Sequence, residues 1–132
     1  MWDPLRKKEV ADTPEERVRQ WFIAQLRDTV GVPAHQMMSE VGFAFGGKHY
    51  RADILVYGPA ATRLAVVECK RPEVALTAEV LEQAMRYNMV LDVSWLIVTN
   101  GRSTYIYKKN GTEFAPCASV PTYGQMCSDG SH

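Results

Sequence analysis

Three charged residues, Asp53, Glu68 and Lys70, interrupt two strand-like segments that are otherwise apolar. Two carboxylates on neighbouring strands supply the oxygen ligands that Mg²⁺ prefers, and leave positions for waters and a phosphate oxygen. A lysine two residues past Glu68 could orient or deprotonate an attacking water and offset charge on the phosphate. The set indicates phosphodiester hydrolysis. The alternative is an ion pair between Lys70 and Glu68 or Asp53 at a strand end.

The segments that must position these side chains have the pattern of strands. Residues 38–45 alternate with a period of two before the turn signal Gly46-Gly47. Residues 51–57 and 63–70 are rich in β-branched and apolar residues. Together the three segments predict an antiparallel meander that places Asp53 and Glu68 on neighbouring strands.

A parallel crossover is expected after the meander. Residues 77–91 have helical periodicity, and residues 93–99 are almost wholly apolar, as in a strand covered on both faces. Strand, helix and strand therefore predict a right-handed β-α-β unit. Asn100-Gly101 favours a tight hairpin turn, with 104–107 as the returning strand at an antiparallel edge of the sheet.

A first helix is predicted over residues 14–29. Thr13 can cap it, Pro14 suits its first position, and Glu16 can reach back in a capping box. One amphipathic helix is expected, because the residues that would share its inner face follow at helical spacing, namely Val18, Trp21, Phe22, Gln25 and Leu26.

Length and composition indicate one ordinary globular domain: the chain has 132 residues, 46% of them hydrophobic and 23% charged. We divide it into an N-terminal segment (1–11), a folded domain (12–109) and a flexible tail (110–132), because the last segment is small, polar and without period. Three cysteines, without a zinc-like spacing or a secretory signal, predict reduced thiols and a cytoplasmic location. No apolar stretch is long enough for a membrane span.

Charge excludes a global electrostatic attraction to nucleic acid, because 15 basic residues balance 15 acidic ones. Contacts with DNA must come from local patches. The candidates are Arg6-Lys7-Lys8, Lys70-Arg71 and Lys108-Lys109, each of which also suits a solvated surface.

The order of the motifs resembles the PD-(D/E)xK nuclease superfamily. It is similar in particular to the N-terminal nuclease domain of type I restriction enzyme R subunits, whose pattern includes RxD, ExK followed by proline, and QxxxY. Over roughly residues 12–109 the chain has these motifs, although Ala52 stands where the superfamily name has proline. They are Arg51-Ala52-Asp53, Glu68-Cys69-Lys70 before Pro72, Gln83 with Tyr87, and a closing Val98-Thr99-Asn100-Gly101.

The resemblance implies a restriction-endonuclease-like three-layer α/β fold, with a mixed central sheet flanked by helices. It implies Mg²⁺, with Mn²⁺ as a substitute, bound by Asp53 and Glu68. Glu16 on the first helix is a further candidate ligand, although the capping box also explains it. Lys70 would be the catalytic lysine and Gln83 would sit near the metal or the DNA backbone.

The resemblance also implies residues that bind substrate. Gln83 and Tyr87 are four apart, so they meet on one face of a helix, where Tyr87 would support Gln83. Arg51 and Arg71 flank the two strand motifs and are predicted to contact the nucleic acid.

Two functions stay open at this point, with a small-molecule or structural domain as a third. One is a metal-dependent deoxyribonuclease that yields a 5′-phosphate and a 3′-hydroxyl. The other is a nucleic-acid-binding or assembly module that keeps the nuclease fold without turnover. It stays open because R subunits drive their nuclease with a translocating ATPase, for which a chain of 132 residues has no room. Expected partners are DNA, a separate motor or specificity subunit, and a second copy paired through the edge strand 104–107.

One motif is a false signal for phosphate binding. Residues 42–49 nearly spell a P-loop, but His49 stands where serine or threonine is required, and a strand follows in place of a helix. ATP binding is therefore not expected. His35 and His49 are interpreted as surface residues.

Overall fold

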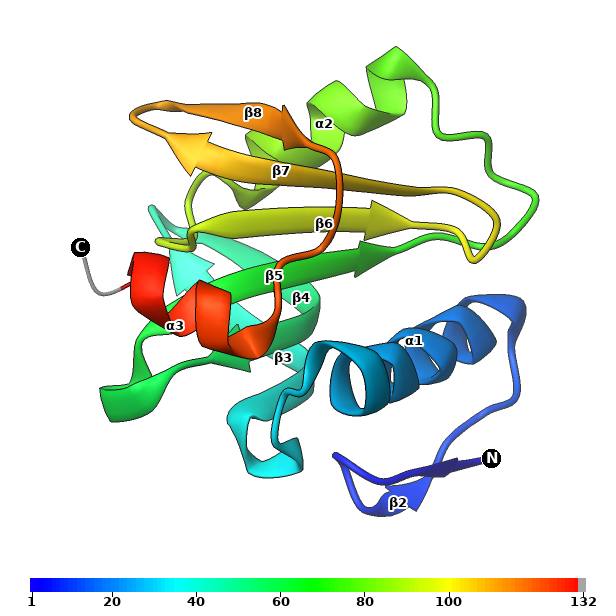
Figure 1. The fold of residues 1–132 in the computed structure, drawn as a ribbon. Helices are drawn as coiled ribbons and strands as arrows, with labels where there is room; N and C mark the ends of the chain where they lie inside the picture. The colour runs from blue at the N-terminus through cyan, green and yellow to red at the C-terminus, as the bar shows by residue number, and fades with distance from the viewer. Residues whose placement is uncertain (131–132) are drawn as a thin grey trace.

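The computed structural model describes residues 1–130, which contain a six-stranded sheet in the order β3-β4-β5-β6-β7-β8 (Figure 1). The strands are Met37–Phe45 (β3), Lys48–Tyr57 (β4), Arg63–Cys69 (β5), Trp95–Thr99 (β6), Thr104–Asn110 (β7) and Glu113–Cys117 (β8). Neighbouring strands are antiparallel except for β5 and β6, which are parallel. The predicted meander and β-α-β crossover are both present.

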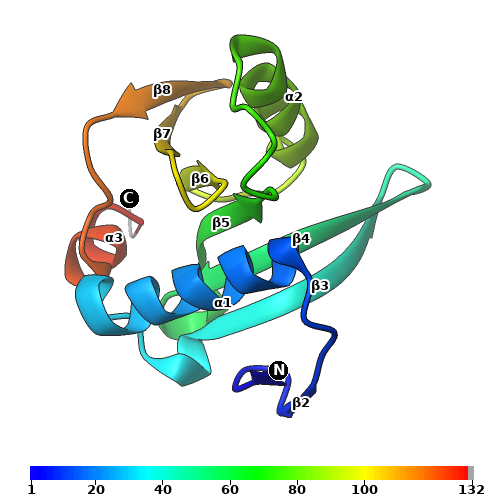
Figure 2. The same ribbon diagram turned by 90° about the vertical axis from the view of Figure 1, so that its right-hand side faces the viewer.

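Helices cover both faces of the sheet, which makes three layers (Figure 2). The helices are α1 (Pro14–Gln25), continued by a π-helical turn (Leu26–Val30), α2 (Ala78–Asn88) and α3 (Tyr123–Gly130), with short 3₁₀ turns at Ala34–Gln36 and Pro59–Ala61. On one face, α1 and α3 enclose one buried apolar cluster, and on the other α2 encloses a second. Within residues 1–130, no helix is long and apolar enough to cross a bilayer.

The start of α1 is as predicted, but one residue expected on its inner face is not. Thr13 Oγ1 accepts a hydrogen bond from the Glu16 N–H at 3.1 Å, and Pro14 is the first helical residue. Phe22 is buried, whereas Trp21 is 42% exposed and its ring lies edge-on to Phe22. One residue is about 100° of helical rotation, so Trp21 lies off the stripe on which Phe22 packs.

The predicted tail, expected to be poorly ordered unless something docks it, is folded onto the domain over residues 113–130. Strand β8 pairs with β7, and Met126 of α3 is fully buried in the apolar cluster beneath α1. The segment docks because it supplies apolar side chains at isolated positions, which gives no period in the sequence. Residues 131–132 of the predicted tail lie outside the described residues. Strand β7 is consequently flanked by β6 and β8, so the predicted edge strand 104–107 is internal.

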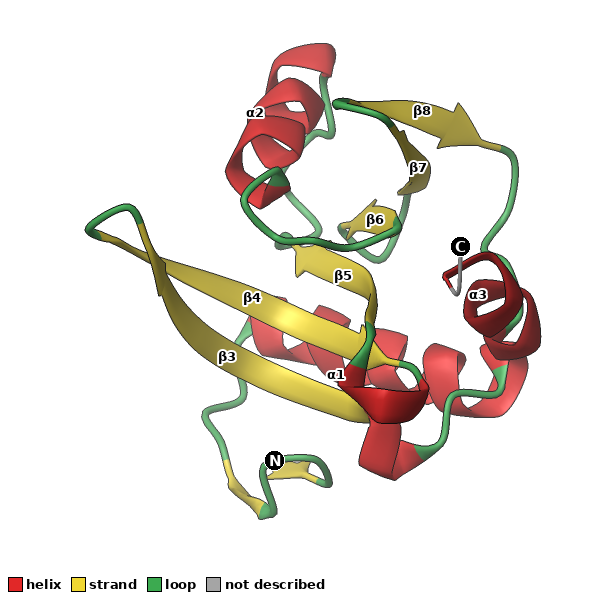
Figure 3. Ribbon diagram, turned by 90° about the vertical axis from the view of Figure 1, so that its left-hand side faces the viewer, coloured by secondary structure: helices red, strands yellow, loops and turns green. Residues whose placement is uncertain are grey.

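The β3–β4 hairpin extends well beyond the layers of the domain (Figure 3). Gly46 and Gly47 form its tip, with φ of 59° and 79°. Two consecutive positive φ angles match the twist of a hairpin turn and favour glycine. The P-loop-like residues therefore build a hairpin, and His49 is exposed on it.

The N-terminal segment 1–11 also has structure of its own. Strands β1 (Trp2–Asp3) and β2 (Lys8–Glu9) pair antiparallel. Asp3 is fully buried, accepts a hydrogen bond from Ser39 Oγ at 3.0 Å, and pairs with Arg6. These contacts attach the segment to β3.

Candidate active site

The sheet register brings the predicted catalytic residues together. In the β4–β5 ladder Ile54 pairs with Val67, so continuing the register by one residue sets Asp53 opposite Glu68. Residues opposite each other on antiparallel strands have Cβ atoms about 5 Å apart. Lys70 follows the end of β5, and its backbone N–H donates to Thr99 O on β6 at 2.8 Å. This hydrogen bond to β6 fixes the position of the Lys70 backbone just beyond the end of β5.

These residues line a cleft of about 450 Å³ between the end of the sheet and α2. Of the residues predicted from sequence, Glu16 and Arg71 do not line it, and Glu15 lines it in addition. The predicted residues that the cleft brings together are Arg51, Asp53, Glu68, Lys70, Gln83 and Tyr87.

Asp53 is held by two donors from different elements. Its Oδ2 accepts a hydrogen bond from the backbone N–H of Cys69 at 2.7 Å, and its Oδ1 accepts one from Arg19 Nη2 at 2.9 Å. Both donors are rigid, because Cys69 belongs to β5 and the Arg19 side chain is only 5% exposed. The orientation of the Asp53 carboxylate is therefore fixed before any ligand arrives.

Arg19 is a buried cation that sequence reasoning missed. Its guanidinium lies within 2.7–3.3 Å of the carboxylates of Glu15, Glu16, Glu40 and Asp53. Burial alone would lower the pKa of Arg19, but the hydrogen bond and charge of Asp53 and the other carboxylates raise it above its usual value. Arg19 Nε is buried without a hydrogen-bond partner among the described residues. The side chain thus holds several acidic groups together that would otherwise repel one another.

Glu16 serves this network and does not reach the cleft. Its carboxylate lies 2.6 Å from Arg6 Nη2 and 2.8 Å from Arg19 Nη1, and Gln20 Nε2 donates to it at 3.2 Å. Burial pushes its pKa up, but these donors hold the pKa below its usual value. The carboxyl group does not complete a capping box either, because the Thr13 N–H donates to Ala11 O.

Glu15 is the residue of the first helix whose carboxyl group faces the cleft. Burial and the nearby charge of Asp53 raise its pKa, and Arg19 opposes this shift. A raised pKa means that the ionised form is disfavoured where it stands, as expected beside a second carboxylate. Among the acidic residues of α1, Glu15 is therefore the better placed to approach a cation in the cleft.

Glu68 is oriented by Lys70 and by Asn88, a second residue that sequence reasoning missed. Lys70 Nζ lies 3.0 Å from Glu68 Oε2, and Asn88 Nδ2 donates to Glu68 Oε1 at 3.0 Å and to Ala84 O at 2.8 Å. Asn88 is only 2% exposed. The sequence could have pointed to Asn88, because position 88 continues the buried stripe of Leu81 and Ala84. A buried amide there needs hydrogen-bond partners.

The exposed side of α2 differs from this buried side. Gln83 lines the cleft, and its side chain makes no hydrogen bond to any residue in the part of the chain that the structure describes. Tyr87 Oη accepts a hydrogen bond from the Arg51 N–H at 2.9 Å, which ties α2 to β4. Arg71 is exposed and its guanidinium lies 3.4 Å from Glu73.

The donor set suits a magnesium ion held with the help of water. Asp53 and Glu68 provide hard oxygen ligands, and each carboxylate oxygen can accept more than the one hydrogen bond named above. Within residues 1–130, no three or more histidine, cysteine or acidic side chains cluster closely enough to form a complete metal cage. Mg²⁺ is commonly bound by one or two carboxylates, with waters and phosphate oxygens completing the shell. The residues present therefore fit this ion.

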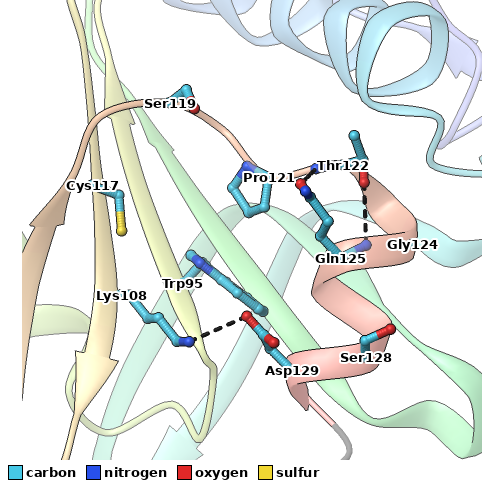
Figure 4. A pocket seen from close by; sticks show the side chains of 10 residues that line it. All are labelled: Trp95, Lys108, Cys117, Ser119, Pro121, Thr122, Gly124, Gln125, Ser128 and Asp129. Carbon is cyan, nitrogen blue, oxygen red and sulfur yellow. Dashed lines mark hydrogen bonds and ion pairs between the residues drawn. The ribbon is translucent and has the colours of Figure 1, made fainter.

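A larger hollow, of about 790 Å³, lies elsewhere between α3, β6 and β7 (Figure 4). Its only carboxylate among the described lining residues is that of Asp129, which lies 3.2 Å from Lys108 Nζ. The same ammonium group stands 5.6 Å from the ring centroid of the buried Trp95. No second acidic group lines this hollow among the described residues, so the candidate active site is the smaller cleft.

The fold and the geometry of the cleft define the structural class of the chain. It has the restriction-endonuclease-like fold, in which acidic residues and a lysine lie at one end of the sheet and face a helix. The family model for the type I restriction enzyme R protein N terminus matches residues 14–121. The chain belongs to this family, as its motifs predict.

A solved structure supports the fold. A fragment of a proposed HsdR subunit of a type I restriction enzyme from Vibrio vulnificus YJ016 is similar with a TM-score of 0.67 and 18% identity. The similarity covers 89% of this chain and 25% of that one, so this chain spans about a quarter of its length. A comparison with curated proteins returns no match.

Proposed function

We propose that this chain is a metal-dependent nuclease that hydrolyses DNA phosphodiester bonds, with Mg²⁺, or Mn²⁺ in its place, held by Asp53 and Glu68. The observation that carries the proposal is the convergence of Asp53, Glu68 and Lys70 in one cleft, each on a rigid strand or next to its end. Membership of the R protein family supports it.

Each residue of the cleft has a distinct part in this reaction. When bound, the ion would supply Lewis-acid polarisation of the phosphate and a more acidic water. Lys70, with its ammonium group held by Glu68, orients the attacking water and offsets negative charge as it develops on the phosphate. Gln83, whose amide is free of protein partners in the described chain, donates to the DNA backbone.

Arg19 and Asn88 are positioning residues in this proposal. They donate to one oxygen each of Asp53 and Glu68, which fixes the orientation of both carboxylates. Such outer partners commonly change metal affinity or activity by about 10- to 100-fold when removed.

Partners follow from the family and from the size of the chain. The family takes its name from the R protein of type I restriction enzymes, and the similar solved chain is about three and a half times as long. We propose that a separate motor or specificity subunit delivers DNA to this cleft in the assembled enzyme, and that the chain alone keeps an undirected cleavage activity.

The experiment is cleavage of supercoiled plasmid and of labelled single strands in Mg²⁺, Mn²⁺ or EDTA by the wild type and by Asp53→Asn. Asp129→Asn is the matched control, because it removes an aspartate from the other hollow. We expect cleavage in either metal by the wild type and the control, and none in EDTA or by Asp53→Asn. Wild-type cleavage rates in Asp53→Asn would contradict the proposal.

A second candidate is a module that binds nucleic acid without cleaving it. The observation that favours it is that all four oxygens of Asp53 and Glu68 already accept hydrogen bonds or ion pairs from the protein. Calorimetric titration with Mn²⁺ separates the two. Binding by the wild type that Asp53→Asn loses supports the nuclease, whereas equal DNA affinity of both proteins without metal binding supports the module.

A further inference from the structure

The distal part of the β3–β4 hairpin, residues 41–51, forms an arm that projects beyond the three layers next to α2 (Figures 2 and 3). Around its tip, Phe45 pairs across the strands with Lys48, and Phe45 is 58% exposed. Such a large exposed aromatic side chain at a tip, beside a cation, covers no apolar core. It is available to a partner.

A row of aromatic rings leads from the arm to the candidate active site. Phe43 and Tyr50 stack with ring centroids 5.4 Å apart and an angle of 14° between their planes, and Tyr50 lies 5.1 Å from Tyr87 on α2. The Tyr87 hydroxyl accepts the backbone N–H of Arg51, which fixes the row to the arm. The rings therefore form a rigid surface that ends at the cleft.

A groove of about 650 Å³ follows this row. Phe43, His49 and Tyr50 line it, and it shares Arg51 and Tyr87 with the catalytic cleft. The two hollows thus meet at these shared side chains. A chain that lies in the groove would enter the cleft at Asp53.

The charges of the groove are opposite to those of the cleft. None of the described residues that line the groove is acidic. Arg51 lies at the junction of the groove with the cleft, where one of its nitrogens pairs with Glu40 at 3.1 Å and its side chain stays 70% exposed. Lys48 adds a cation at the tip. The protein as a whole carries no net charge, so this local excess is a feature of the arm.

Aromatic faces beside cations are the combination that binds a single nucleic-acid strand, because unpaired bases stack on the rings while phosphates meet the cations. A duplex keeps its base faces within its own stack and offers only phosphates to such a groove. The chemistry of the groove therefore discriminates between the two forms of DNA.

We propose that the hairpin arm binds a single-stranded segment of DNA and guides it into the cleft. Bases stack on the Phe43–Tyr50 row and phosphates contact Arg51 and Lys48. The inference rests on the proposed nuclease function and names its substrate form.

The test is binding of a labelled oligodeoxythymidine strand and of a blunt duplex of equal length, measured by fluorescence anisotropy in EDTA so that nothing is cleaved. We expect the wild type to bind the single strand at least about tenfold more tightly, and Tyr50→Ala to lose about tenfold of that affinity. Tyr105→Ala, which removes an exposed tyrosine from β7, is the matched control and should bind like the wild type.

Two variants at the tip guard against an effect of misfolding. Phe45→Ala and Lys48→Ala change exposed side chains, so their unfolding temperatures should equal that of the wild type while both bind the strand more weakly. Lys48→Ala should also reduce the slope of log affinity against log salt by ~0.7. Equal affinity for strand and duplex, or full affinity in Tyr50→Ala, would overturn the inference.

The outcome is separable from that of the proposed function, because EDTA removes the metal. Strand binding that depends on the arm, in a protein that cleaves nothing, would support the arm and contradict the nuclease. Metal-dependent cleavage, combined with strand binding that the arm variants do not weaken, would support the nuclease and contradict the role of the arm.

Discussion

The two helices beside the cleft use polar residues in opposite ways. On α1, Glu16 and Arg19 are 6% and 4% exposed, and both are engaged in ion pairs. On α2, Gln83 and Tyr87 are exposed, and the Gln83 side chain has no hydrogen-bond partner in the described chain. One wall therefore holds Asp53 in place, and the other leaves the Gln83 side chain unpaired in the described chain. The difference predicts that α1 variants lose stability and α2 variants lose activity.

The largest effect should come from Arg19→Met. Removal of the buried guanidinium leaves Glu15, Glu16, Glu40 and Asp53 without the cation that they share. Loss of one partner from a buried ionic network costs about 3–5 kcal/mol of the free energy of unfolding. Urea denaturation at neutral pH measures it.

On α2, Gln83→Ala should leave stability unchanged, in contrast to Arg19→Met on α1. Because its side chain is exposed and has no protein partner in the described chain, we expect its free energy of unfolding to stay within about 0.5 kcal/mol of the wild type. Its cleavage rate should nevertheless fall. A Gln83→Ala protein as unstable as Arg19→Met would remove the distinction between the walls.

Asn88→Ala should have an intermediate effect on both properties. The change leaves Glu68 Oε1 without its donor, which costs about 1–3 kcal/mol in the free energy of unfolding. The Mg²⁺ concentration for half-maximal cleavage should rise on the order of tenfold, because the ligand is less well oriented. An unchanged metal requirement would show that Asn88 serves only the packing of α2.

The smallest effect concerns acid stability. Hydrogen bonds to Arg6, Gln20 and Arg19 hold the pKa of Glu16 below its ordinary value of 4.5 despite burial. The unfolded state therefore binds the proton more readily, and the stabilisation by Glu16 is present above pH 4.5 and lost as the pH falls through the folded pKa. Thermal unfolding from pH 7 to pH 3 should show a shallower acid loss in Glu16→Gln than in the wild type. Parallel curves would contradict this.

The sequence predicts the residues that line the cleft better than the residues that support them. Asp53, Glu68 and Lys70 were recognisable because charge in an apolar strand is conspicuous, and because strand alternation and the crossover fix their neighbours. Arg19 was not, since a charged residue on an amphipathic helix is usually solvated and its partner Asp53 lies 34 positions away. Strand β8 and helix α3 were missed because their apolar residues have no period.

Glu40 is a further residue of the ionic network that the sequence did not predict. It contacts Arg19 and Arg51 from a backbone with φ of 54°, a conformation that residues other than glycine rarely adopt. The register places this residue opposite Asp53 of β4, and its carboxylate lies 2.7 Å from the Arg19 guanidinium. The alternating pattern of a strand predicts regular extended backbone, so it cannot predict a single residue with a positive φ angle.

The most direct test of the central claim is single-turnover cleavage of supercoiled plasmid in Mg²⁺ by the wild type, Lys70→Ala and Lys108→Ala. Both lysines pair with a carboxylate, but only Lys70 lines the cleft. We predict that Lys70→Ala loses cleavage with its thermal unfolding unchanged, while Lys108→Ala cleaves like the wild type. Cleavage by Lys70→Ala at the wild-type rate would contradict the assignment of this cleft as the active site.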